Sequence, residues 1–142
     1  MSLEQISVFL ENKAGRMAEV TGILAGAGVD IKALSLADTS EFGILRLVVD
    51  QKEKARESLK ARGFTVTRTP VTAVEIKNEP GGLHKVLKIL GSGGINVEYM
   101  YGFPCPTADA IMIFRFDRTE QAVELLQNHQ VRIFSEKDLL LL

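Results

Sequence analysis

Two short loops of the chain combine residue types that suit the binding of a small zwitterion. Gly15 and Gly81 each stand where an apolar helical pattern begins, and glycine lets another group approach the backbone closely. The N-terminus of a helix presents unpaired N–H groups and a partial positive charge, which suit a carboxylate. Asn12 and Asn78 precede these glycines and offer both a donor and an acceptor. The pattern therefore favours an anion site at each loop.

A second pair of polar residues follows each helix. Asp30 and Asn96 open the next predicted strand, and we expect the strand–helix–strand connection to bring them near the loop. Their side-chain oxygens accept hydrogen bonds from an ammonium group, so the two features together suit an amino acid. The residues also allow a plainer interpretation, in which Asn caps the helix and Gly shapes a turn. Residue types alone leave both interpretations open.

These loops occur twice because the chain repeats itself. The offset is 66 residues at first and 67 further on, and the matching segments are 12–17 with 78–83, 28–31 with 94–97, and 44–50 with 111–117. An offset held this closely indicates two copies of one structural unit. We expect the first unit to cover residues 1–70 and the second to cover residues 71–142.

Hydrophobic periodicity predicts the same elements in both halves. The expected strands are 6–10, 29–36, 44–49 and 64–67, then 72–77, 95–103, 111–116 and 131–134; the expected helices are 17–27, 52–62, 83–90 and 121–128. Both halves then have the order βαββαβ, which is that of ferredoxin-like folds. The sequence predicts an α+β protein of two such units side by side, with antiparallel sheets and helices on one face. Whether residues 136–142 add a helical turn is open.

The sheet face away from the helices is predicted to be apolar. Leu45, Leu47 and Val49 alternate toward the helices, which leaves another apolar set on the opposite face: Phe9, Ile44, Val48, Ile111 and Ile113. A face this apolar is expected to be covered. A homodimer that stacks sheet on sheet is the simplest arrangement, so we expect a dimer.

Composition excludes several classes of protein. The 142 residues carry a net charge of −1, which argues against a nucleic-acid footprint. No apolar run reaches the length of a membrane span, and no signal peptide opens the chain, so we expect no membrane contact. The lone Cys105 suits the reducing cytoplasm. Two distant histidines and one cysteine predict no metal site, and no cofactor fingerprint or nucleophile–base arrangement is present.

The repeated motif resembles the ACT domain, a small regulatory module attached to many enzymes of amino-acid metabolism. The resemblance is carried by Asn78-x-Pro80-Gly81-x-Leu83, by the later segment Gly94-Ile95-Asn96-Val97, and by the βαββαβ order over both halves. In that family, amino acids bind between adjacent modules, near the first loop and the start of the second strand. The resemblance therefore implicates Asn78, Gly81, Gly82, Leu83 and Asn96, with first-half counterparts Asn12, Gly15, Arg16, Met17 and Asp30.

The resemblance implies a binding protein of two ACT modules that senses an amino acid and has no catalytic domain. The alternative is a regulatory subunit that docks onto a separate enzyme of amino-acid metabolism through its sheet face. A third class, a small enzyme with an unrecognised site, is the weakest. Arg16 stands where the second half has Gly82, and Asp30 where it has Asn96, so the two sites need not share a ligand, and one can be empty. RNA-recognition modules share the fold but need aromatic residues on the central strands, which residues 43–47 lack.

Overall fold

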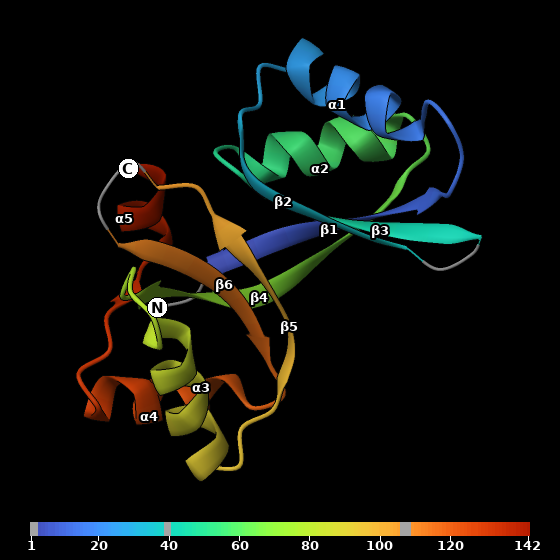
Figure 1. Ribbon diagram of the computed structural model, residues 1–142. Helices are drawn as coiled ribbons and strands as arrows, with labels where there is room; N and C mark the ends of the chain where they lie inside the picture. The colour runs from blue at the N-terminus through green and yellow to red at the C-terminus, as the bar shows by residue number, and fades with distance from the viewer. Residues whose placement is uncertain (1–2, 39–40, 106–108) are drawn as a thin grey trace. The chain divides into compact units, whose positions relative to one another are not determined.

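The computed structural model describes residues 3–38, 41–105 and 109–142 (Figure 1). The chain divides into two compact units. One unit, here called module 1, is Glu4–Thr69; the other, module 2, is Pro70–Leu142 together with the start of the chain. The division falls inside a strand, so the two modules follow one another without a linker.

Module 1 has the predicted order βαββαβ. Its elements are β1 (Leu3–Glu11), α1 (Arg16–Gly26), β2 (Ile31–Asp38), β3 (Phe42–Val49), α2 (Lys52–Ala61) and the first part of β4 (Thr65–Ile76). The strands lie in the order β2-β3-β1-β4, and β3 is antiparallel to both β1 and β2. β1 and β2 therefore run in the same direction, which decides what lies at each end of the sheet.

Module 2 repeats this order with the second part of β4. It continues with α3 (Gly82–Ser92), β5 (Val97–Phe103), β6 (Ala110–Phe116), α4 (Thr119–Asn128), β7 (Ile133–Phe134) and α5 (Glu136–Leu140). β6 is antiparallel to both β4 and β5, and the two-residue β7 pairs with β4. The terminal helical turn that the sequence left open is present, because the Ser135 side chain caps α5 by accepting a hydrogen bond from the Asp138 N–H at 3.1 Å.

The prediction of two strands at 64–67 and 72–77 is wrong in one respect, since β4 is a single strand of 12 residues. Pro70, which lacks an N–H group, lies in the gap between the two predicted strands. Its carbonyl oxygen instead accepts a hydrogen bond from Arg115 Nη1 at 2.9 Å. A proline fits within a strand wherever no ladder hydrogen bond needs its nitrogen, and the flanking threonines and valines favour extended backbone.

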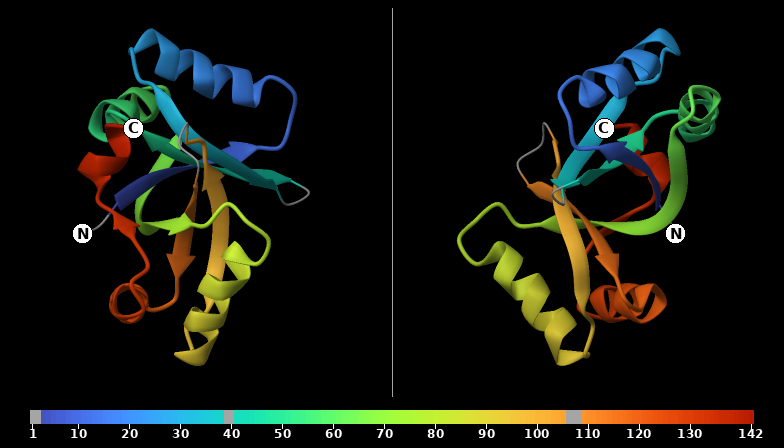
Figure 2. Two further views of the ribbon diagram at one scale, coloured as in Figure 1. Left: turned by 60° about the vertical axis from the view of Figure 1, so that its left-hand side comes forward. Right: turned by 90° about the vertical axis from the view of Figure 1, so that its right-hand side faces the viewer.

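Each module has its own core between its helices and one face of its sheet (Figures 1 and 2). In module 1, Val20 and Leu24 of α1 and Leu59 of α2 pack on sheet residues that include the predicted Leu45, Leu47 and Val49. The core of module 2 is built at equivalent positions: Val74, Ile76, Phe114 and Phe116 from the sheet, Val86 and Leu90 from α3, and Ala122 and Leu126 from α4. The helices thus cover one face of each sheet, as the periodicity predicts.

The opposite face differs from its prediction in how it is covered. Val48, Ile111 and Ile113 are at most 2% exposed in the single chain, Ile44 is partly buried, and Phe9 is 43% exposed. Three of the five apolar residues are therefore buried in the single chain, and stacking between two copies stays a prediction. No helix in the described part of the chain is long and apolar enough to cross a membrane.

Candidate functional site

The two predicted loops share one backbone conformation. Gly15 and Gly81 are the N-cap residues of α1 and α3, with left-handed φ angles of 88° and 83°. Glycine adopts this conformation without the strain that a Cβ brings. At neither helix does a side chain cap the first turn by a hydrogen bond. The interpretation of Asn12 and Asn78 as helix caps is therefore wrong, because the glycines occupy the cap position.

In module 1 the loop borders a pocket of about 350 Å³. Four of the predicted residues line it, namely Asn12, Gly15, Arg16 and Met17, and the others are Leu10, Glu11, Lys13, Ala14, Leu36, Asp38 and Gly43. The volume lies in the range of about 300–1,000 Å³ that is typical of small-molecule pockets. Its wall carries cations, carboxylates and apolar side chains, so the structure brings the first-half loop residues together around one cavity.

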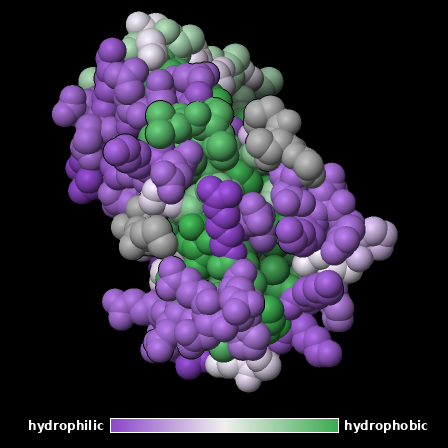
Figure 3. Space-filling model, turned by 90° about the vertical axis from the view of Figure 1, so that its left-hand side faces the viewer, coloured by the Kyte–Doolittle hydropathy of each residue, from purple (hydrophilic) through white to green (hydrophobic). Residues whose placement is uncertain are grey.

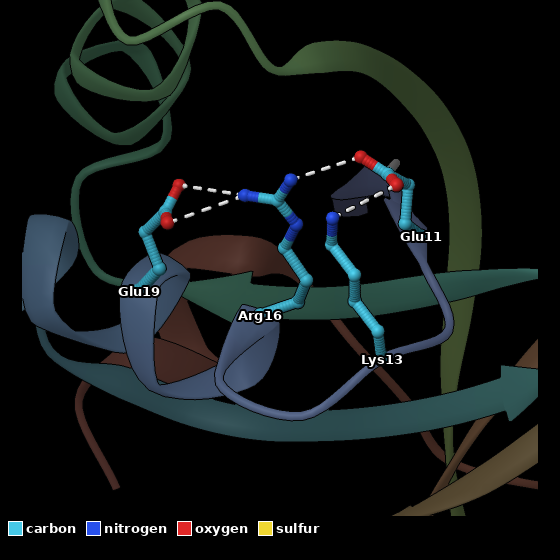
Figure 4. A network of polar contacts seen from close by, with 4 residues as sticks. All are labelled: Glu11, Lys13, Arg16 and Glu19. Carbon is cyan, nitrogen blue, oxygen red and sulfur yellow. Dashed lines mark hydrogen bonds and ion pairs between the residues drawn. The ribbon is translucent and has the colours of Figure 1, made fainter.

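Ion pairs cross the charged side of this pocket (Figure 4). Arg16 reaches Glu11 at 2.9 Å and Glu19 at 3.3 Å, and Lys13 reaches Glu11 at 3.2 Å. The hydrogen bond from Lys13, and then that from Arg16, lowers the pKa of Glu11. Pairs at the surface contribute little to stability. A ligand carboxylate can therefore replace Glu11 or Glu19 as partner of these cations at little cost.

Asp38 completes the pocket, and the sequence analysis missed it. It is the last residue of β2 and lies opposite Gly43, which in turn lies opposite Leu10 at the end of β1. Because β1 and β2 run in the same direction, both end at the edge of the sheet where the loop begins. The predicted order βαββαβ was enough to indicate Asp38. In that order the second strand ends, and does not start, beside the loop that follows the first strand.

Asp30 consequently lies at the other end of the sheet, and the expectation that it joins the loop of its own module is wrong. Its N–H donates to Asp50 Oδ1 at 2.9 Å, and its carboxylate pairs with Lys32 at 2.9 Å. Eight residues of β3 separate this end from the loop. At about 3.3 Å per residue, that is roughly 20–25 Å. Asn96 has the equivalent place in module 2, where its N–H donates to Asp117 Oδ1 at 3.0 Å.

The loop of module 2 is tied to its own sheet. A Cβ placed on Gly82 would lie 2.0 Å from the carbonyl oxygen of Lys77, so the backbone there is in close contact with itself. The Asn78 N–H donates to Asp109 Oδ1 at 3.3 Å, and Lys77 pairs with Asp109 at 3.8 Å. Leu83 packs against the core of the module. Arg16, at the position of Gly82, shows that the first loop leaves room for a side chain.

The chain thus consists of two βαββαβ units, each with a glycine loop at the start of its first helix. A family model described as "ACT domain pair" matches residues 1–142. The chain belongs to the ACT domain pair family. Among the residues described, no group of three or more His, Cys, Asp or Glu side chains comes together as a metal site would require.

Solved structures with this fold include proteins of nearly the same length as this ACT domain pair. Protein BT0572 from Bacteroides thetaiotaomicron is 38% identical, with a TM-score of 0.93, over 100% of this chain and 98% of that one. The ligand-free regulatory subunit of aspartate kinase from Thermus thermophilus is 19% identical, with a TM-score of 0.63, over 88% of this chain and 91% of that one. A structure of aspartokinase alpha and beta subunits gives 16% identity and a TM-score of 0.57 over 88% and 90% of the two chains. No curated protein matches the chain.

Proposed function

We propose that this ACT domain pair binds a free amino acid at the loop of module 1 and acts as a regulator without catalytic activity. One observation carries the proposal. The pocket of about 350 Å³ is lined by Asn12, Gly15, Arg16 and Met17, which the sequence had singled out, and it holds both signs of charge. A zwitterion needs both signs within a few ångströms, and this pocket supplies them within one module.

The chemistry assigns each end of the ligand to a partner. The carboxylate accepts from the first-turn amides of α1, which no side chain caps, and from Lys13. The ammonium donates to the carboxylate of Asp38. The side chain of the ligand lies against Met17 and Leu36. These two apolar walls favour an aliphatic side chain over a charged one.

The remaining predicted residues have smaller parts in this proposal. Asn78, Gly81, Gly82 and Leu83 form the corresponding loop of module 2, which its contacts to Asp109 and Lys77 hold closed. Asp30 and Asn96 lie at the far ends of their sheets, so they do not reach a ligand at the loop of their own module.

Homodimerisation stays a prediction, with a different contact from the one first expected. The edge strand β2 exposes Leu34 and Leu36, at 48% and 51%, beside unpaired backbone groups. Two copies pairing through β2 would cover both residues. Sedimentation across micromolar concentrations tests this, and a stable monomer would contradict it. The cytoplasm is the proposed location, on the basis of the single Cys105.

A second candidate function is that of a regulatory subunit which docks onto a separate enzyme. The likeness in fold to the regulatory subunit of aspartate kinase, over 88% of this chain, supports considering it. The route first expected runs through the apolar sheet face, of which Val48, Ile111 and Ile113 are buried in the single chain. In either candidate, the ligand transmits a signal only if it binds two arrangements of the protein with different affinity.

A thermal-shift screen of the twenty amino acids tests the proposed function. A ligand at 100 times its dissociation constant adds about 2.7 kcal/mol to the free energy of unfolding. Calorimetry with the amino acid selected then compares Asp38→Ala with Asp30→Ala, two exposed carboxylates at opposite ends of β2. We expect Asp38→Ala to weaken binding by about 1.5–3 kcal/mol, the value of a hydrogen bond to a charged group, and Asp30→Ala to leave it unchanged. If no amino acid shifts the melting temperature, the proposed function is wrong.

A further inference from the structure

A second pocket in module 1 lies on the other side of the same loop. It has a volume of about 370 Å³ and is lined by the ends of β1 and β4 and by the turn after α2. It shares only Leu10, Glu11 and Arg16 with the amino-acid pocket described above. The two cavities therefore share part of one wall, and most of the residues that line each of them are different.

The lining of this pocket is unusually aromatic for an exposed surface. Phe9, Phe42 and Phe64 all line it, and Phe9 and Phe42 are 43% and 55% exposed. Among the described residues, Phe9 and Phe42 are the aromatic members of the set of large apolar side chains that are exposed. Burial of the exposed part of these two side chains is favourable, and a ligand with a flat apolar body would cover it.

The charges of the pocket leave one cation available. Glu11 and Glu19 both hold Arg16, at 2.9 and 3.3 Å. Arg62 lines the same cavity beside Phe64, and within the described residues no carboxylate pairs with it. A guanidinium presents a planar fork of donors that matches a carboxylate. The available charge therefore selects an anion at the end of the pocket where Arg62 lies.

Module 2 shows the same place filled by polar groups. The offsets of 66 and 67 residues place Glu75 at the position of Phe9, Asp109 at that of Phe42, and Arg132 at that of Thr65. The register agrees, because Phe9 lies opposite Ile44 and Glu75 opposite Ile111. Arg132 pairs with Glu75 at 3.8 Å, and Lys77 pairs with Asp109 at 3.8 Å. The aromatic character thus belongs to module 1 and is not a requirement of the fold.

We infer that this pocket of module 1 binds a small carboxylate with an aromatic body, its ring against Phe9 and Phe42 and its carboxylate on Arg62. The ligand needs no ammonium group, which separates it in class from the amino acid of the proposed function. A module that holds both ligands can respond to two metabolites. Arg16 and Glu11 form the shared wall through which the two sites are coupled.

The probe for this site is 3-phenylpropionate, which has the ring and the carboxylate but no ammonium. Titration of the ¹⁵N-labelled full chain is expected to move the amide signals of residues 62–65. Arg62→Gln should weaken binding at least about tenfold, which is the loss of a charged hydrogen bond. Phe42→Ala should weaken it about threefold or more, in line with aromatic contacts. The matched controls Lys60→Gln and Leu34→Ala change an exposed cation and an exposed apolar residue outside the pocket and should leave binding unchanged.

Two further probes identify which part of the ligand matters. Uncharged 3-phenylpropanamide and ring-free butyrate should both bind at least about tenfold more weakly than 3-phenylpropionate. The inference is overturned if 3-phenylpropionate at millimolar concentration moves no signal at residues 62–65, if Arg62→Gln binds it as well as the parent does, or if the amide binds equally. Asp38→Ala should leave this binding intact. Failure here would thus leave the amino-acid proposal standing, and failure of that proposal would leave this site standing.

Discussion

Modules 1 and 2 have the same backbone and use it differently at the loop that opens the first helix. Both loops place a left-handed glycine at the N-cap, within 5° of the same φ angle. Around that shared turn, module 1 has Arg16 and an open pocket, whereas module 2 has Gly82 pressed against the carbonyl of Lys77. A repeated motif therefore specifies a helix start in both places, and the neighbouring side chains decide where a ligand has room.

The surface of the helices shows the same divergence. Figure 3 shows white and pale green atoms, which are neutral to weakly hydrophobic, at its top, where α1 lies. Apart from Glu19, the exposed residues of α1 are small, namely Ala18, Gly22, Ala25 and Gly26. The equivalent helix α3 exposes His84, Lys85 and Lys88. Duplication has kept the core positions of the two modules and left their outer surfaces free to change.

The largest expected effect comes from adding a methyl group where the loop of module 2 is closed. Gly82→Ala sets a Cβ against the Lys77 carbonyl oxygen, so the backbone must shift, at a cost of about 1–3 kcal/mol. The counterpart Arg16→Ala removes exposed ion pairs only and should cost about 1 kcal/mol or less. Urea unfolding measures both. Equal costs would mean that the two loops are not packed differently.

A smaller loss of stability is expected at the glycine turn that both modules share. Gly15→Ala and Gly81→Ala each force a Cβ into left-handed backbone, which costs roughly 1–2 kcal/mol. Neither position has another atom close enough to collide with the new Cβ, so the two losses should be similar. Differential scanning calorimetry of both variants checks this. A loss of stability in only one of the two variants would show that the modules do not both need glycine at this turn.

The smallest expected effect is electrostatic and is confined to module 1. Module 2 has Lys77 at the position that corresponds to Glu11. Lys13 and Arg16 hold the pKa of Glu11 below its usual value. A carboxylate with a lowered pKa stabilises the fold above its unfolded value, and this contribution is lost as the pH falls through the folded value. Titration by NMR should find the Glu11 pKa raised toward the usual value of a glutamate in Lys13→Gln and unmoved in Lys60→Gln. An unmoved pKa in Lys13→Gln would contradict the pairing.

The sequence predicted the repeated βαββαβ order because buried positions such as Leu45 and Phe114 alternate cleanly along their strands. It did not predict the continuity of β4, because Pro70 looks like a break unless its hydrogen-bond partners are known. Four loop residues of module 1 proved to line a pocket, but Asp38 and Phe42 were missed. The direction and order of the strands decide which strand ends lie together. Local sequence patterns give this information only indirectly. The place of Asp30 was wrong for the same reason.

The central claim, that the loop of module 1 is the working amino-acid site, is tested most directly by the amide signals of the two equivalent glycines. The ¹⁵N-labelled chain is titrated with the amino acid that raises the melting temperature most. The account predicts that Gly15 and Arg16 shift with a saturating dependence on ligand concentration, while Gly81 and Gly82 stay in place. Shifts at Gly81 and Gly82 with none at Gly15 would contradict it and assign the site to module 2.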